Sequence, residues 1–185
     1  MPKTNRILFL CRHAESLMNR NRLLSSSDDE GLTSDGRRQS IALGKVLVRM
    51  GACAILTSPL TRARQTAEIA AGIARLNVTV CPWLRERDYG QYNNMTLDNV
   101  VQARIQSRHE YTDVAQDWGS VGTVESSSDV ALRFWNGINE RSKFAHRLSC
   151  VTHAGVVVSV LHELFGVSLV RQAIFKVRNA CVVSL

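Results

Sequence analysis

The chain has no long hydrophobic run. Its apolar stretch at residues 7–11 is far shorter than the roughly 20 residues that a membrane-spanning helix needs. The same stretch lacks a small-residue cleavage site, so it does not resemble a secretory signal peptide. We therefore expect a cytoplasmic protein that has no membrane partner.

The chain also lacks a CxxC pair. Its cysteines lie mostly inside apolar, strand-like runs: Cys11, Cys53, Cys81, Cys150 and Cys181. That arrangement is typical of buried free thiols in a reducing compartment, and it does not indicate a disulfide framework. Metal-ligand spacing is missing as well, since His109, His146 and His162 do not form a pattern that holds zinc. We expect no metal and no cofactor.

Basic residues are not gathered into a block, although the formal net charge is +7. Scattered Lys and Arg are typical of a solvated surface with a local anion site, so we expect a small phosphorylated substrate rather than nucleic acid. The 185 residues contain no repeat, low-complexity tract or linker, which predicts one domain over residues 1–185. No pattern specifies an oligomeric state.

Strand-like and helix-like patterns alternate along the chain. Strands are predicted at 6–11, 54–58, 78–84 and 148–155, with two more strand-like runs on either side of Asn179. Helices are predicted at 34–50, 61–76, 98–109, from Ser126 onward and at 156–166, with irregular segments at 20–34 and 110–125. This alternation is typical of βαβ units. It predicts an α/β fold, namely a three-layer α/β/α sandwich around a mostly parallel central sheet.

Chemically useful side chains follow the predicted strands. Arg12 and His13 come directly after the first strand, and Arg62 lies in the first turn of the helix after the second. Glu86 follows the third strand, and His153 follows the fourth. Because the carboxyl ends of parallel strands meet at one edge, where α/β sheets bind their ligands, we expect these side chains to converge.

This set suits phosphoryl transfer through a covalent intermediate. A neutral imidazole at His13 can attack phosphorus, while Arg12 and Arg62 bind the phosphoryl oxygens in bidentate fashion. His153 can donate a hydrogen bond to an equatorial oxygen during the transfer. The helix that begins around Ala154 adds backbone N–H donors and a favourable dipole.

A carboxyl group completes the predicted chemistry. Glu86 can protonate the leaving oxygen and can later take a proton from the attacking water. Asp88, Glu110 and Glu125 are alternatives for this task, while Glu15 is expected to orient other groups rather than to react. The fixed cations neutralise the phosphoryl group, so the scheme requires no metal.

The stretches RHAES, SPLTRARQTA, LRERDYG and VTHAGVV occur in that order. Together they resemble the four motifs of the histidine phosphatase superfamily, which has the phosphoglycerate mutase-like fold, and the resemblance spans residues 6–180. It implies that His13 is the phosphorylated nucleophile and that Glu86 is the proton donor. It also implies a phosphate pocket made by Arg12, Arg62 and His153, with Asn19 helping to hold the phosphate. The stretch LTSDGRRQ resembles a family segment whose role is mostly structural.

The chain departs from the family pattern in two places. Ala14 stands where a glycine usually follows the nucleophile, which is tolerated if its backbone φ is negative. QYNNMT follows Gly90, where the family often has an aromatic residue and a glycine, so residues 93–125 are predicted to be a variable insertion at the substrate mouth.

Two kinds of enzyme remain open at this point, and a third possibility is not an enzyme. The compact chain favours a phosphatase that hydrolyses phosphomonoesters, because in a phosphatase water must reach the phosphohistidine. The alternatives are a phosphoglycerate mutase-type phosphotransferase and a catalytically silent phosphate-binding module.

Overall fold

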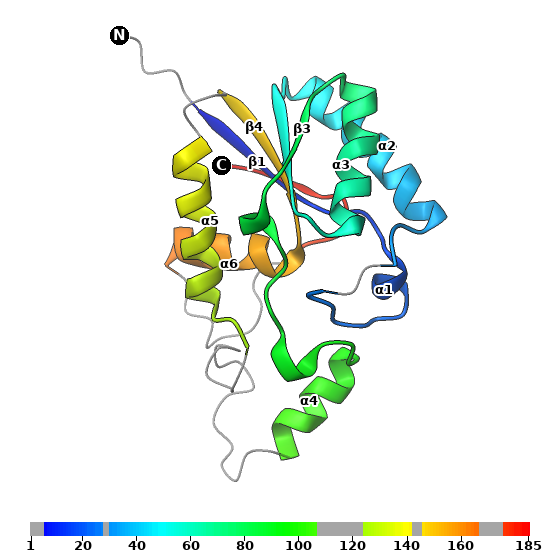
Figure 1. Ribbon diagram of the computed structural model, residues 1–185, viewed down its shortest axis with the longest axis vertical. Helices are drawn as coiled ribbons and strands as arrows, with labels where there is room; N and C mark the ends of the chain where they lie inside the picture. Colours follow the sequence, from blue (N-terminus) through cyan, green and yellow to red (C-terminus); the bar gives the residue numbers. More distant parts are fainter. Residues whose placement is uncertain (1–5, 28–29, 107–123, 142–145, 167–175) are drawn as a thin grey trace.

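A computed structural model of the chain describes residues 6–27, 30–106, 124–141, 146–166 and 176–185. Within these ranges, a sheet of five strands in the order β3-β2-β4-β1-β5 lies between two layers of helices (Figure 1). This architecture confirms the predicted α/β/α sandwich.

The centre of the sheet is formed by the most apolar runs of the sequence. β1 (Ile7–Arg12) pairs in parallel with β4 (Arg147–Thr152), and β4 pairs in parallel with β2 (Ala54–Thr57). β3 (Val78–Val80) continues the parallel arrangement beyond β2, whereas β5 (Val182–Ser184) runs antiparallel beside β1. The sheet is therefore mostly parallel, as the alternating pattern predicted.

One face of the sheet is covered by α2 (Ser34–Arg49) and α3 (Thr61–Ala74) (Figure 1). Successive side chains of a strand point to opposite faces, and Phe9 and Cys11 of β1 enter the core beneath these two helices. Leu47 of α2 joins them with no exposed surface. The apolar stripe of the helix predicted at 34–50 thus faces the sheet.

The opposite face is covered by α5 (Ser127–Arg141) and α6 (Ala154–Phe165) (Figure 1). Leu10 of β1 points into this core, where it joins Phe134 of α5 and Val160 of α6. Burial on both faces explains why the sequence of β1 is a continuous apolar run rather than an alternating one. None of the described helices is long and apolar enough to cross a membrane.

Three short elements lie near the carboxyl ends of the parallel strands. They are α1 (Leu17–Arg20), the 3-10 turn η2 (Gly90–Tyr92) and α4 (Leu97–Gln106), which extends beyond the end of the sandwich (Figure 1). A small core of Tyr92, Val100 and Val124 joins η2 and α4 to the start of the segment before α5. Of these elements, α4 belongs to the described part of the insertion expected at residues 93–125, and η2 directly precedes it.

The observed elements differ from the predicted ones in two places. The strand expected at 78–84 ends at Val80 and gives way to the 3-10 turn η1 (Pro82–Leu84), because Pro82 has no N–H to donate to a sheet ladder. The helix α1 was not predicted, since four residues are too few to show a helical period. The strand-like run before Asn179 lies largely outside the described residues.

Candidate active site

His13 lies immediately beyond β1 with its ring in a defined orientation. Its backbone N–H donates to Thr152 O at 2.8 Å, which extends the pairing of β1 with β4. Ring atom Nδ1 lies 2.7 Å from Ala14 O. A carbonyl oxygen can only accept, so Nδ1 carries the proton and donates it, and the lone pair is left on Nε2.

The surroundings of His13 keep its ring uncharged. The side chain is almost fully buried, and this burial, followed by the positive charges of Arg62 and Arg12, holds its pKa well below the usual value. The hydrogen bond to Ala14 O opposes this shift but does not offset it. At neutral pH the ring therefore has a free lone pair on Nε2, which is the state that a nitrogen nucleophile requires.

His153 lies directly against His13. The centroids of the two rings are 5.0 Å apart and the ring planes are inclined at 58°. Nε2 of His153 contacts Ser58 Oγ at 2.7 Å, while Nδ1 is buried and has no hydrogen-bond partner among the described residues. Burial and then the charge of Arg62 lower the pKa of His153 well below its usual value, so this ring is neutral too.

The two predicted arginines approach the same cavity from different elements. Arg62 in the first turn of α3 is 2% exposed, and its Nη2 donates to Ser25 O at 2.8 Å. Arg12 at the end of β1 donates from Nη1 to Val177 O at 2.7 Å, and its buried Nε has no partner among the described residues. A buried donor without an acceptor is costly, and an anion in the cavity would supply the acceptor.

Asn19 is held by a pair of contacts that leave its amide nitrogen available. Its Oδ1 accepts from the backbone N–H of Ser16 at 3.3 Å, within a capping box that begins α1. The same oxygen accepts from Asn179 Nδ2 at 2.8 Å. Because Oδ1 is occupied twice, Nδ2 of Asn19 is the group left to donate to a ligand.

Glu86 lies in the irregular segment after η1 and is 5% exposed. Its Oε1 accepts from the N–H of Arg87 at 2.8 Å, and its Oε2 accepts from the N–H of Gly155 at 3.5 Å. Burial raises the pKa of Glu86 despite these hydrogen bonds and the charges of Arg62 and Arg12. A carboxyl group with a raised pKa can retain a proton and donate it.

The alternative carboxylates are engaged elsewhere. Asp88 is exposed and accepts from the N–H of Gly90, and Glu125 forms an ion pair with Arg133 at 2.7 Å. Glu15 accepts from Thr33 Oγ1 at 2.7 Å rather than facing the cavity. Glu110 lies outside the described residues. Glu86 is therefore the carboxyl group of the predicted set that reaches the cavity.

The loop after His13 is fixed by the LTSDGRRQ segment. Gln39 Oε1 accepts from the N–H of Glu15 at 2.9 Å, and a Cβ at Gly36 would lie 2.1 Å from Glu15 O. Only a glycine permits this approach. Ala14 does not have a positive φ, which is why it can replace the glycine usual at that position, and its N–H donates to Thr66 Oγ1 at 3.0 Å.

These side chains surround one cavity of about 490 Å³. Its lining includes the predicted residues Arg12, His13, Asn19, Arg62, Glu86 and Ala154. His153 lies behind His13 with no exposed surface and does not line the cavity. The part of the chain that the structure describes contains no group of three or more His, Cys, Asp or Glu side chains suited to a metal ion.

Other lining residues were missed by sequence reasoning. They include Met18, Arg22, Leu23, Ser25, Tyr89, Asp98 and Asn179. Asn179 reaches the cavity because β5 returns antiparallel beside β1, and its Nδ2 also donates to His13 O at 3.2 Å. An isolated asparagine in a turn has no local pattern that signals such a position. Tyr89 belongs to the quoted LRERDYG stretch, which was the available signal.

A match to a family model defines the class of protein to which this site belongs. The family model of the histidine phosphatase superfamily (branch 1) matches residues 8–185. The chain therefore belongs to the histidine phosphatase superfamily, whose enzymes act on small phosphorylated substrates, and the similar proteins include both phosphatases and mutases.

Particular relatives illustrate this range. A protein named "Probable phosphoglycerate mutase GpmB" from Erwinia tasmaniensis is 25% identical over 177 residues, which are 95% of this chain and 82% of the relative. YhfR from Bacillus stearothermophilus has a similar structure, with a TM-score of 0.81, 25% identity and coverage of 96% of this chain and 89% of that one. A mycobacterial glucosyl-3-phosphoglycerate phosphatase shares the fold with a TM-score of 0.80, at 23% identity over 97% of this chain and 90% of that one.

Proposed function

We propose that the protein hydrolyses small phosphomonoesters through a covalent phosphohistidine at His13. The observation that carries the proposal is the 2.7 Å contact of His13 Nδ1 with Ala14 O, which leaves the lone pair on Nε2, at a cavity that His13 lines together with Arg12 and Arg62. In the first step the Nε2–P bond forms while the P–O bond of the ester breaks. Protonated Glu86 gives its proton to the leaving alcohol oxygen.

The second step regenerates the enzyme. Glu86, now a carboxylate, takes a proton from water, and the water oxygen attacks phosphorus while the N–P bond breaks. Orthophosphate leaves, the lone pair returns to Nε2, and Glu86 is again protonated. The pair of fixed guanidinium charges from Arg12 and Arg62 balances the dianionic phosphoryl group throughout both steps.

The remaining predicted residues bind the phosphoryl group or support the nucleophile. Nδ2 of Asn19 is available as a donor, and the backbone at Ala154 begins α6, whose N-terminal dipole favours an anion. His153 supports the ring of His13 through their contact. Its hydrogen bond to a phosphoryl oxygen stays a prediction from the sequence, because its side chain has no exposed surface and does not line the cavity. None of these roles requires a metal.

Mutase activity is the second candidate, because the Erwinia relative is named as a phosphoglycerate mutase. A mutase must exclude water from the phosphohistidine, whereas a phosphatase must admit it. The cavity includes the exposed side chains of Asn21, Arg22 and Asp98, which supports access of water and therefore hydrolysis. Conversion of 3-phosphoglycerate to 2-phosphoglycerate that depends on 2,3-bisphosphoglycerate would identify a mutase instead.

We also place the reaction in the cytoplasm. The cysteines of the chain are free thiols, and Cys11, Cys81 and Cys150 are buried. Burial raises the pKa of the thiol of Cys150 well above its usual value, so it remains protonated and unreactive. Unpaired cysteines are typical of a reducing compartment.

Trapping the phosphorylated enzyme tests the proposal. The enzyme is mixed with a radiolabelled aryl phosphate, and the reaction is quenched rapidly without acid. We then expect label on the wild-type protein that is stable in alkali and lost in acid. His13→Ala should abolish both the label and turnover, because it removes the nucleophile. His146→Ala, which changes an exposed histidine, should preserve both. Label that persists in His13→Ala would overturn the proposal, and binding of phosphate without turnover would identify a silent module.

A further inference from the structure

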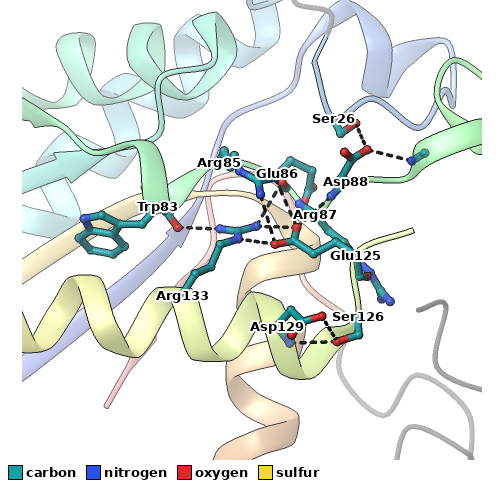
Figure 2. A network of polar contacts seen from close by, with 11 residues as sticks. Ser26, Trp83, Arg85, Glu86, Arg87, Asp88, Glu125, Ser126, Asp129 and Arg133 are labelled. Atoms are coloured by element: carbon teal, nitrogen blue, oxygen red, sulfur yellow. Dashed lines mark hydrogen bonds and ion pairs between the residues drawn. The ribbon is translucent and has the colours of Figure 1, made fainter. Parts of the chain in front are cut away.

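The carboxyl group of Glu86 is carried by a segment that has almost no secondary structure of its own. After η1 ends at Leu84, residues 86–89 belong to no helix or strand. Regular hydrogen bonding therefore does not fix the position of Glu86, and contacts with neighbouring elements must do so. Figure 2 shows that these contacts converge on Arg133 and Glu125.

Arg133 holds this segment by its backbone. From the side of α5 that faces η1, its Nη1 donates to Trp83 O at 2.6 Å and its Nη2 donates to Glu86 O at 3.2 Å (Figure 2). The guanidinium group thus links the backbone carbonyl groups of Trp83 and Glu86, which lie at the two ends of the turn that leads to Glu86. It does so from a largely buried position, with 16% of the side chain exposed.

Glu125 holds Arg133 in turn. Its carboxylate accepts from Arg133 Nε at 2.7 Å and from Arg133 Nη2 at 3.1 Å, a bidentate pair with a fixed relative orientation (Figure 2). Burial raises the pKa of Glu125, but hydrogen bonds and charge from Arg133 outweigh that effect and lower it overall. Arg133 therefore favours the carboxylate form of Glu125.

Residues 125–127 also bind the far end of the Glu86 segment. The N–H of Glu125 donates to Asp88 O at 2.9 Å, and the N–H of Asp88 donates to the Glu125 carboxylate at 3.1 Å. Arg87 Nε donates to Glu125 O at 2.6 Å. Glu86 is consequently held from both sides, by Arg133 at its own carbonyl and by Glu125 around its neighbours.

We infer that Arg133 and Glu125 are positioning residues for Glu86, which set where its carboxyl group lies during proton transfer. Neither side chain lines the cavity, so neither touches the substrate. Their effect reaches the reaction through the backbone of Glu86, whose Oε1 and Oε2 then meet the N–H groups of Arg87 and Gly155. The inference rests on the proposed role of Glu86 as proton donor.

The test exploits the leaving group, because an acid is needed most when the alcohol leaves poorly. We expect Arg133→Gln to lower kcat/KM for an alkyl phosphate such as glycerol 2-phosphate by about 100-fold, the scale of a 1 Å misplacement. The loss for p-nitrophenyl phosphate should be much smaller. Comparing the two substrates in one preparation cancels any difference in the fraction of folded enzyme.

A matched control is available in Arg85, which pairs with the same carboxylate at 3.4 Å but is 46% exposed. Arg85→Gln should leave the ratio of alkyl to aryl activity unchanged. Glu125→Gln should lower this ratio in the same direction as Arg133→Gln, and Arg133→Lys should recover part of it by restoring the charge and one donor.

Each outcome decides between the inference and the function on which it rests. A wild-type protein without phosphatase activity would remove the proposed function itself. If Glu86→Gln changes the alkyl-to-aryl ratio but Arg133→Gln and Glu125→Gln do not, the proton donor stands and the positioning role is overturned. An equal loss for both substrates in Arg133→Gln would likewise reduce Arg133 to a purely structural role.

Discussion

At the scale of single residues, burial favours the uncharged form of both imidazoles and of the carboxyl group. It lowers the pKa of His13 and His153 and raises that of Glu86, because a low-dielectric site disfavours the charged form of every group. Burial thus favours the neutral form of the two imidazoles and of the carboxyl group. Under the proposed mechanism, the guanidinium groups of Arg12 and Arg62 that line the cavity suit a dianionic phosphoryl group.

This electrostatic arrangement predicts how kcat/KM depends on pH. His13 must be deprotonated to attack, and burial with Arg62 lowers its pKa, so the acidic limb should have its midpoint below the usual histidine value of about 6.5. Glu86 must be protonated to donate, and burial raises its pKa, so the basic limb should lie above the usual glutamate value of about 4.3. Initial rates measured across pH with substrates of different phosphate pKa separate the enzyme's own ionisations from those of the substrate.

Glu86→Gln provides the control for this profile. It should remove the basic limb and preserve the acidic limb, since His13 remains. An acidic limb at or above the usual histidine pKa in the wild-type protein would show that His13 is protonated in the free enzyme, contrary to its burial beside Arg62.

At the scale of elements, the first turn of α6 determines how closely Glu86 can approach. The N–H of Gly155 meets Glu86 Oε2, and a Cβ at this position would lie 2.5 Å from Glu86 Oε1 and 3.0 Å from the Cβ of Arg87. The carboxyl group therefore occupies space that any side chain on this turn would fill. A glycine is required here by packing rather than by backbone conformation.

Gly155→Ala should accordingly lower activity while the fold persists. We expect kcat/KM to fall by roughly tenfold or more because the carboxyl group is displaced, with the greater loss for alkyl phosphates. Gly72→Ala is the matched control, since its Cβ would meet nothing within 4 Å, and alanine should stabilise α3 by about 0.5–1 kcal/mol. Kinetics and thermal melting of both variants test the contrast, and full activity in Gly155→Ala would contradict it.

The elements that could be predicted from the sequence are those with a strong hydrophobic period. β1 and β4 are buried on both faces and are continuous apolar runs in the sequence, and the predicted site residues His13 and His153 follow them directly. α1, in contrast, is only four residues long, and its start depends on the single cap at Ser16. Elements of this size are defined by contacts that a sequence pattern does not show.

The same distinction separates the predicted and unpredicted parts of the site. Residues that follow strand ends could be assigned to one edge of the sheet by topology alone. The contact of Asn179 with Asn19, 160 residues away in the sequence, depends on how β5 returns to the sheet.

The Ser126 cap of α5 was visible in the sequence, and its Oγ does accept from the N–H of Asp129 at 3.0 Å. The role of Arg133 in the next turns was not visible, because two of its hydrogen bonds go to the backbone carbonyl groups of Trp83 and Glu86, which a sequence pattern does not specify.

At the scale of the whole molecule, the cavity joins parts of the chain that are far apart in sequence. Arg12 of β1 contacts Val177 near the C-terminal strand, and Arg62 of α3 contacts Ser25 in the loop after α1. An oxyanion bound between these guanidinium groups would link several elements that are otherwise connected through the sheet. An anion that binds only to the folded state must stabilise that state against unfolding.

Orthophosphate or vanadate should therefore raise the melting temperature of the wild-type protein. At a concentration 100 times Kd the gain is about 2.7 kcal/mol, and it should grow with the logarithm of anion concentration. Arg62→Ala should lose most of the increase, because it removes a charge that lines the cavity. Arg64→Ala removes an equal charge from the exposed face of the same helix and should retain the increase. Equal responses from these two variants would mean that the anion stabilises the protein through its general positive charge, and that β1, α3 and the C-terminal turn do not form a specific anion site.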